Sequence, residues 1–514
     1  MRRSLTLALA LSLCCTLTAC WTYEPVAEER GFWEAEPDAA APAEAPMGAA
    51  VFTLPYLNNQ TLDPIACSDG VQQTVGSLLY ESLFILDERF EPQPHLCASF
   101  TRSPNGLTYT FALRDDVTFT NGAPLTASDV LAAYRRAQAS ERYAARFANI
   151  TSMRVSRGAL IITLKQPDSA LPALLDIPIV KSGTEKDPVP AGTGPYLFLT
   201  DSEGPCLVRN ESWWYGVTPP LERIALAAAK DADTAVYLFS ADQAHLLVAD
   251  LLAETPAGAL GDVDITDAPT STLLFLGFNT KTEALADSAL RRAMNAALDR
   301  NAIVTTLLAG HASAAQFPIS PASPLYPAAL ETEYDNGGYA DALAALFPAP
   351  EEGEAAAGPP ELTLLVNEEN SFKRALAEYL ARQLSEAPLT VTPVILPWAD
   401  YLAALESGGF DLWLGEVRLT ADWDAASLVG TGGVLNYGGY ADAATDAALK
   451  AFLADETEAT ADALCTRLAE EAPLLPLVFK TVSVLTPRGT VDGLAPTAAQ
   501  PFAHPERWTV HMPE

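Results

Sequence analysis

The clearest pattern of hydrophobic and polar positions in the chain lies between residues 106 and 130. Hydrophobic side chains alternate with polar or small ones over 108–113 and again over 117–119, the two-residue period of half-buried β-strands. The dipeptide Asn121-Gly122 precedes a small residue and a proline and predicts a turn. Thr126 stands three residues before an aspartate and predicts the N-cap of a helix.

In the second half of the chain, strand-like and helix-like hydrophobic periods follow one another regularly. The segments, in the order strand, helix, strand, helix, strand, are 362–366, 371–385, 389–396, 400–407 and 410–414. This repetition predicts a parallel, doubly wound α/β sheet. Because ligands of such sheets bind beyond the carboxyl ends of the strands, we expect a site after residue 414.

Three other segments carry weaker patterns. A helix is predicted over 287–308, with Asp299 and Arg300 as solvated capping residues rather than catalytic ones. Residues 331–360 are rich in Ala, Glu, Pro and Gly and predict a surface excursion. The glycines of Gly192–Tyr196 predict a tight turn and not a phosphate loop, because GxGxxG and a following lysine are absent.

The first residues have the anatomy of a secretory leader, with a basic start followed by an apolar run from residue 5 to about 13. The run Leu17-Thr18-Ala19-Cys20 matches a bacterial lipobox, in which the cysteine is acylated and becomes the new N-terminus. An ordinary leader cut near residue 19 is the alternative. We therefore predict a signal peptide over 1–19, lipidation of Cys20, and a flexible linker over 20–48.

Composition and charge narrow the classes of function. The 514 residues carry a formal net charge of −34, which argues against nucleic acid and against electrostatic adhesion to anionic lipid. The four cysteines beyond residue 20 have no metal-ligand spacing, and both disulfides and buried thiols stay open for them: Cys67, Cys97, Cys206 and Cys465. Five scattered histidines without HExxH give no sign of a metal, and no cofactor is predicted.

The residues of the first segment, GLTYTFALRDDVTFTNGAPLTASDV, resemble a phrase of the family 5 solute-binding proteins of ATP-driven importers, with Asn121 in place of the usual aspartate. Leu79–Phe84 is similar to the "YESL" segment of that family, and Gly192–Tyr196 to its "GTGPY" segment. The resemblance implies a two-lobed, periplasmic-binding-protein-like α/β fold of type II. An extra subdomain in the first lobe and a hinged cleft are expected with it.

The order of the family-like phrases implies a discontinuous first lobe. Its expected parts are 49–272, with the extra subdomain at about 75–190, and a C-terminal return over 479–514. The second lobe is expected over 273–478, where the strand–helix repetition lies. Two or three crossover strands would then act as the hinge.

The resemblance also implies ligand-binding residues beyond the strand 410–414. In peptide-binding relatives, an aspartate at the position of Asp422 binds the ammonium group of the ligand, and Asp424 is a second acid here. Ala425 replaces the proline of that phrase, which leaves the class of ligand open. The alternative is that Asp422 caps a helix over 425–428.

Further candidates come from both halves of the chain. Trp398 matches a tryptophan that lines the pocket in the family, and Trp423 adjoins the predicted aspartate. Arg418 is predicted to meet a ligand carboxylate, with an exposed ion pair as the alternative. The run Asn59-Gln60-Thr61 precedes an "LDP" phrase that is similar to one in the family, where it lies beside the strand that meets the backbone of the ligand. We therefore predict that these three residues contact the ligand, and the alternative is that they only form a turn.

Two classes of function compete, a binding protein and a secreted hydrolase that uses paired carboxylates. The hydrolase has no nominated nucleophile, because the sequence has no G-x-S-x-G elbow and no S-x-x-K. We therefore predict a monomeric, lipid-anchored extracytoplasmic protein, not an enzyme. The predicted role is to capture a solute and deliver it to the permease and ATPase of an ABC importer. A short peptide is the solute class that we predict first. A ligand sensor of the same fold is the alternative.

Overall fold

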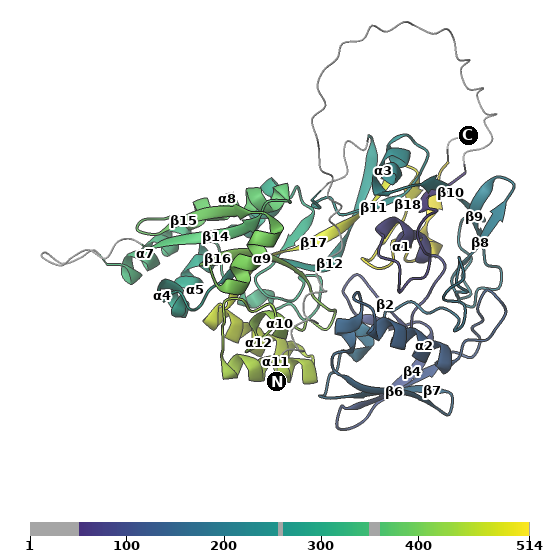
Figure 1. The fold of residues 1–514 in the computed structure, drawn as a ribbon, viewed down its shortest axis with the longest axis horizontal. Helices are drawn as coiled ribbons and strands as arrows, with labels where there is room; N and C mark the ends of the chain where they lie inside the picture. The colour runs from purple at the N-terminus through teal and green to yellow at the C-terminus, as the bar shows by residue number, and fades with distance from the viewer. Residues whose placement is uncertain (1–50, 255–260, 349–359, 513–514) are drawn as a thin grey trace, which may run out of the picture.

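The computed structural model describes residues 51–254, 261–348 and 360–512. The predicted leader, Cys20 and the linker over 20–48 lie outside these residues. Two lobes are joined by two long antiparallel strands, β12 (Val263–Phe278) and β17 (Leu474–Pro487), which run through the middle of the molecule (Figure 1). The register of this pair shifts after Pro269 and again after Leu274, so the connection between the lobes is an irregular ribbon.

A seven-stranded sheet with the order β11-β17-β12-β16-β14-β15 forms the base of the second lobe, and its edge strand β11 pairs with the end of β17 that lies beside the first lobe. Strand β13 also pairs with β17. The remaining strands are β11 (Leu247–Ala249), β13 (Ala312–Ala314), β14 (Glu361–Asn367), β15 (Thr390–Leu396) and β16 (Leu412–Arg418). Only β14 pairs in parallel, with β15 and β16. The parallel arrangement predicted for the strands over 362–414 is confirmed, and the connecting strands β12 and β17 join the same sheet antiparallel to their neighbours.

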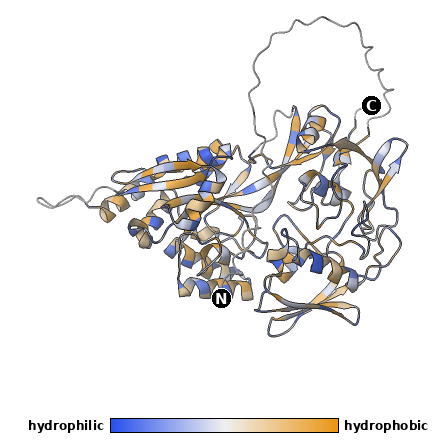
Figure 2. Ribbon diagram, in the orientation of Figure 1, coloured by the Kyte–Doolittle hydropathy of each residue, from blue (hydrophilic) through white to orange (hydrophobic). Residues whose placement is uncertain are grey.

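Helices cover this sheet and complete the hydrophobic core of the lobe. Hydrophobic residues concentrate along its strands, whereas the helices present both hydrophobic and hydrophilic residues (Figure 2). These helices are α4 (Glu283–Ala286), α5 (Ser288–Ala296), α6 (Arg300–Ala302), α7 (Asn336–Leu346), α8 (Ser371–Leu384), α9 (Trp398–Ser407), α10 (Ala426–Val429), α11 (Ala443–Ala454) and α12 (Glu458–Glu471). The alternation of strands and helices over 362–414 is thus confirmed.

Two expectations for this lobe are wrong. The predicted helix over 287–308 is broken after Ala296, and its second part is α6 followed by a π-helix, Ile303–Leu307. Asp299 does cap α6, but Arg300 is buried rather than solvated. The expected surface excursion contains α7, whose Tyr339 and Leu343 are fully buried in the core. Apolar packing therefore orders part of a segment whose composition predicted a loop.

The first lobe contains a four-stranded sheet with the order β1-β10-β9-β8. Its strands are β1 (Thr53–Leu57), β8 (Tyr196–Asp201), β9 (Gly204–Arg209) and β10 (Arg223–Ala229), with helices α1 (Gly70–Gly76) and α3 (Ala232–Ser240) beside them. The C-terminal strands β18 (Val491–Asp492) and β19 (Thr509–Val510) form a separate pair. Phe502 and Trp508 of this segment pack in one cluster with Phe52 and Leu54, so both ends of the described chain share a core.

A second sheet of the first lobe has the order β4-β5-β7-β6 and is packed against α2 (Ala127–Gln138). Its strands are β4 (Cys97–Arg102), β5 (Thr108–Leu113), β6 (Ile150–Ser156) and β7 (Ala159–Leu164), and a hairpin of β2 (Phe84–Leu86) and β3 (Pro92–Pro94) precedes them. The strand over 108–113 and the Thr126–Asp129 capping box are confirmed. The second strand predicted over 117–119 is wrong, because only an isolated bridge forms there.

Glycines bring the 192–196 loop against the end of α1. A Cβ atom on Gly192 would lie 2.0 Å from the carbonyl oxygen of Leu79, and the backbone N–H of Gly194 donates to that oxygen at 3.0 Å. Neither glycine has a positive φ, so their role is close backbone approach rather than the tight turn predicted from sequence. The short helices not yet named are η1 (Ala144–Phe147), η2 (Leu171–Leu174), η4 (Ala328–Leu330) and η5 (Pro505–Arg507).

Candidate functional site

Asp422 lies in the loop that follows β16, at the carboxyl end of a strand where the sequence placed a ligand site. Its residue surface is 6% exposed, and its carboxylate accepts hydrogen bonds from the Thr420 hydroxyl and from the backbone N–H of Asp424. The helix in this place, α10, begins at Ala426, and the carboxylate that accepts the Ala426 N–H at 2.8 Å belongs to Asp424. Asp422 therefore does not cap this helix.

Two further carboxyl groups interact electrostatically with Asp422, one from the other lobe and one from its own lobe. Asp168 comes from the loop after β7 in the first lobe, and Glu456 from the loop between α11 and α12 in the second. The same loops are bonded together, since Ser169 N–H donates to the Leu453 carbonyl at 3.0 Å and Glu456 N–H to the Ser169 hydroxyl at 2.7 Å. We call Asp168, Asp422 and Glu456 the acidic niche.

The pKa values of all three carboxyl groups in the acidic niche are raised. Desolvation raises the pKa of Asp168 to about 7, and the nearby Asp422 charge adds to the rise. Desolvation also raises the pKa of Asp422 to about 6, while the Thr420 hydrogen bond opposes the rise. The pKa of Glu456 is raised by burial and by both aspartates, and its buried Oε1 has no hydrogen-bond partner among the described residues. Such a site favours a cation from outside the chain.

The raised pKa values predict a stability that falls as the pH rises. An unfolded aspartate has a pKa of about 3.9, so between about pH 4 and 7 the folded chain binds more protons than the unfolded chain at Asp168 and Asp422. Each pKa unit is about 1.4 kcal/mol. We therefore expect Asp422→Asn, without ligand, to be about 2 kcal/mol more stable than the wild type at pH 8 and equal to it near pH 4, measured by urea unfolding at each pH.

A matched control for this prediction is Asp116→Asn in the first lobe. The pKa of Asp116 is lowered by its hydrogen bond to Arg114, so its contribution to stability is present above about pH 4 and lost in acid. This variant should therefore gain nothing relative to the wild type as the pH rises. An advantage of Asp422→Asn that does not change with pH would contradict the electrostatic origin of the effect.

The two predicted tryptophans have different surroundings. Trp423 is 2% exposed, has a positive φ of 52°, and contacts Phe90 of the first lobe edge-on with ring centroids 5.0 Å apart. Phe90 also has a positive φ, so two strained residues meet between the lobes. Trp398 is 37% exposed, begins α9 and stacks on Tyr401 with ring centroids 5.6 Å apart. Trp398 therefore offers a free ring face, whereas Trp423 packs between the lobes.

The remaining predicted residues lie on the surface. Arg418 is the last residue of β16 and is exposed, and no ion pair of the described residues includes it. Asn59, Gln60 and Thr61 follow β1 and are exposed; Asn59 donates to the Lys230 carbonyl at 3.2 Å. No contact joins these three to the acidic niche, so their part in binding stays a prediction. Asp168 and Glu456 were missed because neither stands in a motif.

An ion-pair network ties the connecting strands to both lobes. Lys480 of β17 is 5% exposed, and its ammonium lies 2.5 Å from the Asp250 carboxylate of the first lobe and 3.6 Å from Glu416 of β16. Glu416 lies 2.9 Å from Lys373 as well. Although desolvation opposes it, the two lysines lower the pKa of Glu416, so this network stays charged and holds the hinge region in register.

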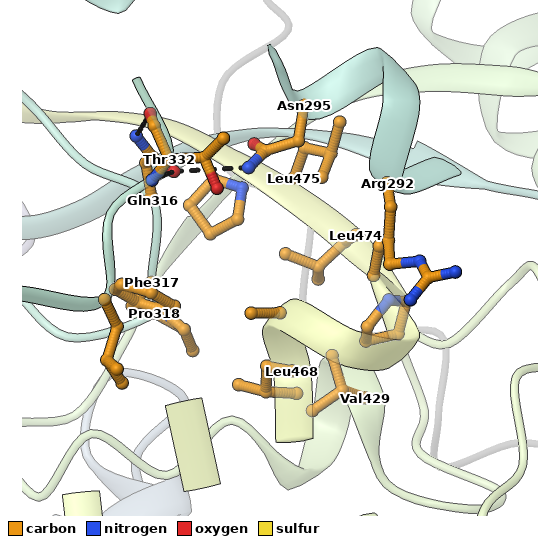
Figure 3. A pocket seen from close by; sticks show the side chains of 15 residues that line it. Arg292, Asn295, Gln316, Phe317, Pro318, Thr332, Val429, Leu468, Leu474 and Leu475 are labelled. Carbon is orange, nitrogen blue, oxygen red and sulfur yellow. Dashed lines mark hydrogen bonds between the residues drawn. The ribbon is translucent and has the colours of Figure 1, made fainter. Parts of the chain in front are cut away.

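A cavity of about 260 Å³ lies inside the second lobe, between α5, α12 and the start of β17 (Figure 3). Its wall is mostly apolar and contains none of the site residues predicted from sequence. The Asn295 amide donates to Gln316 at 3.2 Å, and Gln316 donates to the Thr332 carbonyl at 2.7 Å, so these polar groups of the wall are bonded to one another. This cavity is separate from the acidic niche.

Three further observations bear on the class of protein. The cysteines Cys67, Cys97, Cys206 and Cys465 are all buried free thiols. Within the described residues, no group of three or more His, Cys, Asp or Glu side chains is arranged to hold a metal ion. Within the same residues, no helix combines the length and the hydrophobicity that crossing a membrane would require.

Comparison with solved structures supports the architecture. HbpA2 from Haemophilus parasuis has a TM-score of 0.72 at 20% identity, covering 90% of this chain and 99% of that protein. NikZ from Campylobacter jejuni, solved in complex with Ni(L-His), has a TM-score of 0.62 at 20% identity, covering 89% and 99%. At this identity the likeness shows the fold alone. The two-lobed α/β fold expected from sequence is confirmed.

Comparison of sequences gives the family. The glutathione-binding protein GsiB of Salmonella typhi is 28% identical over 285 residues, which are 51% of this chain and 55% of that protein. The chain thus spans about half the length of the curated relatives it matches. Residues 91–433 match the model of the bacterial extracellular solute-binding proteins, family 5 Middle. Because this match covers most of the 514 residues, the protein belongs to the bacterial extracellular solute-binding proteins of family 5.

Proposed function

We propose that the protein binds a solute with an ammonium group between its two lobes, and that Asp422 is the principal partner of that group. The observation that carries the proposal is the acidic niche, in which Asp168 of the first lobe interacts electrostatically with Asp422 and Glu456 of the second. An ammonium placed there would relieve three mutually repelling carboxyl groups and contact both lobes. Ligand contacts of this kind favour the closed arrangement.

A short peptide is the proposed solute. Its amino terminus supplies the ammonium group, and an aromatic ring such as that of Trp398 suits an apolar side chain. The relative GsiB is a glutathione-binding protein, and glutathione is a tripeptide, which agrees with this class. Asn59, Gln60, Thr61, Trp423 and Asp424 remain proposed contacts, and the relatives give no reason to propose turnover.

The family supports a proposed cellular role. The protein is proposed to be exported, to be anchored through a lipidated Cys20, and to act as a monomer that delivers its solute to the permease and ATPase of an ABC importer. The proposed first lobe consists of residues 49–272 and 479–514, and the proposed second lobe consists of residues 273–478. Strands β12 and β17 form the proposed hinge. Rotation of two lobes about the strands that connect them is a common way for a binding protein to close on its solute.

A thermal-shift screen tests the proposed solute. The mature chain is mixed with a pool of tripeptides with free ends, with the same pool acetylated at the amino end, with sugars, and with nickel–histidine. We expect only the free-amine pool to raise the melting temperature, by about 2 °C or more when the ligand exceeds Kd a hundredfold. Stabilisation by sugars alone, or equally by the acetylated pool, would overturn the proposal.

A further inference from the structure

Three hydrogen bonds join a sheet of the first lobe to the loop between α11 and α12 of the second lobe. The backbone N–H of Ser169 donates to the Leu453 carbonyl at 3.0 Å, and the backbone N–H of Glu456 donates to the Ser169 hydroxyl at 2.7 Å. In addition, Nη2 of Arg102 donates to the Ala454 carbonyl at 2.7 Å. Arg102 ends β4 and Ser169 follows β7, so two segments of one sheet contact the same loop. We call these three hydrogen bonds the lobe contact.

The first-lobe side of the lobe contact is fixed by its own lobe. The buried Tyr109 donates its hydroxyl to the Asp168 carbonyl at 2.7 Å, and the Asp168 carboxylate accepts the Ala170 N–H at 2.9 Å. The guanidinium carbon of Arg102 lies 6.0 Å from the centre of the Tyr109 ring. One buried tyrosine therefore positions both the arginine and the loop that contains the serine.

The second-lobe side supplies acceptors that need donors. Leu453 and Ala454 are the last two residues of α11, and the last carbonyl groups of a helix have no partner within the helix. The lobe contact gives each of these carbonyls a donor from the first lobe. One donor is the cationic Arg102, which the negative end of a helix dipole favours. The next residue, Asp455, is fixed because its carbonyl accepts the Thr460 hydroxyl at 2.7 Å.

The lobe contact lies away from the proposed hinge. Helices α11 and α12 lie beside the sheet that contains β4, β6 and β7 in the lower part of the molecule, whereas β12 and β17 join the lobes above them (Figure 1). An open space of about 320 Å³ separates the lobes here, lined by Arg102 and Asn105 of the first lobe and by Ala454 and Asp455 of the second. Water therefore competes for the donors and acceptors of the lobe contact, so the contact can break and form again.

We propose that the lobe contact is a latch that holds the two lobes together before a solute binds. All three bonds join groups of the chain itself, so they favour the closed arrangement whether or not a solute is present. Ser169 adjoins Asp168, so opening the latch separates Asp168 from the other two carboxyl groups of the acidic niche. The inference rests on the proposed movement of the lobes about β12 and β17, but not on the proposed solute.

Hydrogen exchange of the mature chain, measured without any solute, tests the latch. The Ser169 N–H is the reporter, because its bond to the Leu453 carbonyl crosses between the lobes and is not itself removed by a change at Arg102. Arg102→Ala removes one bond of the latch. Arg102→Glu also places an acceptor against the Ala454 carbonyl, so it should open the latch further.

Arg382 provides matched controls in the second lobe. It is an exposed arginine of α8 whose guanidinium carbon lies 5.6 Å from the ring centre of Tyr379, much as Arg102 lies 6.0 Å from Tyr109. Arg382→Ala and Arg382→Glu therefore make the same changes of charge and ring contact without touching the lobe contact. Far-ultraviolet circular dichroism of each variant checks folding, and Arg102→Ala is the milder change if Arg102→Glu does not fold.

We expect exchange at the Ser169 N–H to be about two- to twelvefold faster in Arg102→Ala, the factor by which one hydrogen bond changes an equilibrium. Exchange should be faster still in Arg102→Glu and unchanged in both Arg382 variants. Separation of the lobes is read by single-molecule fluorescence transfer between dyes on Ser128→Cys of α2 and Ala447→Cys of α11, both exposed positions, in chains that also carry Cys20→Ala. The fraction of open molecules should rise by the same factor as the exchange rate.

Two results would overturn the inference. Unchanged exchange at Ser169 in both Arg102 variants would show that the lobe contact does not hold the lobes together. Faster exchange with unchanged fluorescence transfer would assign the bonds to movement of a loop within one lobe. Because neither measurement uses a solute, both results leave the proposed peptide binding to the thermal-shift screen, and a screen without a binding peptide would leave the latch in place.

Discussion

Asp422→Asn is expected to weaken binding of the peptides selected by the wild-type protein by about thirtyfold or more. Removing one member of a buried, hydrogen-bonded charge pair costs about 2–5 kcal/mol, since the partner is left unpaired, and each 1.4 kcal/mol is a factor of ten. An asparagine keeps the shape and the contacts to Thr420 and Asp424 but removes the negative charge. Isothermal calorimetry at pH 7.5 measures the change.

The pH dependence of the same affinity gives a second readout. Because the pKa of unliganded Asp422 is about 6 and that of Asp168 about 7, an arriving ammonium must displace protons from the acidic niche below about pH 7. Wild-type affinity should therefore rise from pH 5 to about pH 7, where the peptide amino group is still protonated, with a smaller rise in Asp422→Asn. Identical pH profiles for the two proteins would show that the ammonium group binds elsewhere.

Asp424→Asn is the matched control in the same loop. Asp424 accepts the Ala426 N–H that begins α10, and asparagine caps a helix about as well as aspartate, so the stability of this variant should stay within about 0.5 kcal/mol of the wild type. Because Asp424 is proposed only as a second acid at the site, its variant should weaken binding far less than Asp422→Asn. If Asp424→Asn lost the affinity and Asp422→Asn kept it, the roles assigned to the two residues would be reversed.

Local patterns predicted local structure in this chain. The Thr126 hydroxyl and N–H both reach the Asp129 carboxylate, and the strand over 108–113 buries Tyr109 and Phe111 as its alternation required. The strand expected at 117–119 failed because a strand needs a partner, and its neighbours supply only one bridge. Patterns confined to one segment carry no information on such partners.

Features that join distant segments were the ones the sequence could not predict. The mixed sheet arises because β12 and β17, far apart in the chain, insert as an antiparallel pair beside β16. In the same way, Asp422 was found from its place after a strand, whereas Asp168 and Glu456 reach it only through the folded arrangement of both lobes.

The buried arginine that interrupts the predicted helix 287–308 should matter greatly for stability. Arg300 is 5% exposed, and its Nε donates to the carbonyl oxygens of Pro476 and Ala315 at 2.8 and 3.0 Å. Its Nη2 donates to the Asn295 side chain at 2.6 Å. Burial lowers the pKa of Arg300 to about 10, so the group remains charged at neutral pH. It joins the end of α5 to β17, the strand that continues into the hinge.

We expect Arg300→Met to lower the free energy of unfolding by about 3–5 kcal/mol, because buried acceptors on three segments lose their donor at once. Arg382→Met, which removes an exposed arginine from α8, should change it by less than about 0.5 kcal/mol. Urea unfolding followed by circular dichroism measures both variants, and similar slopes would show that the folded states are comparable. A loss below about 1 kcal/mol for Arg300→Met would mean that water replaces the guanidinium, and that the break after Ala296 is held by apolar packing alone.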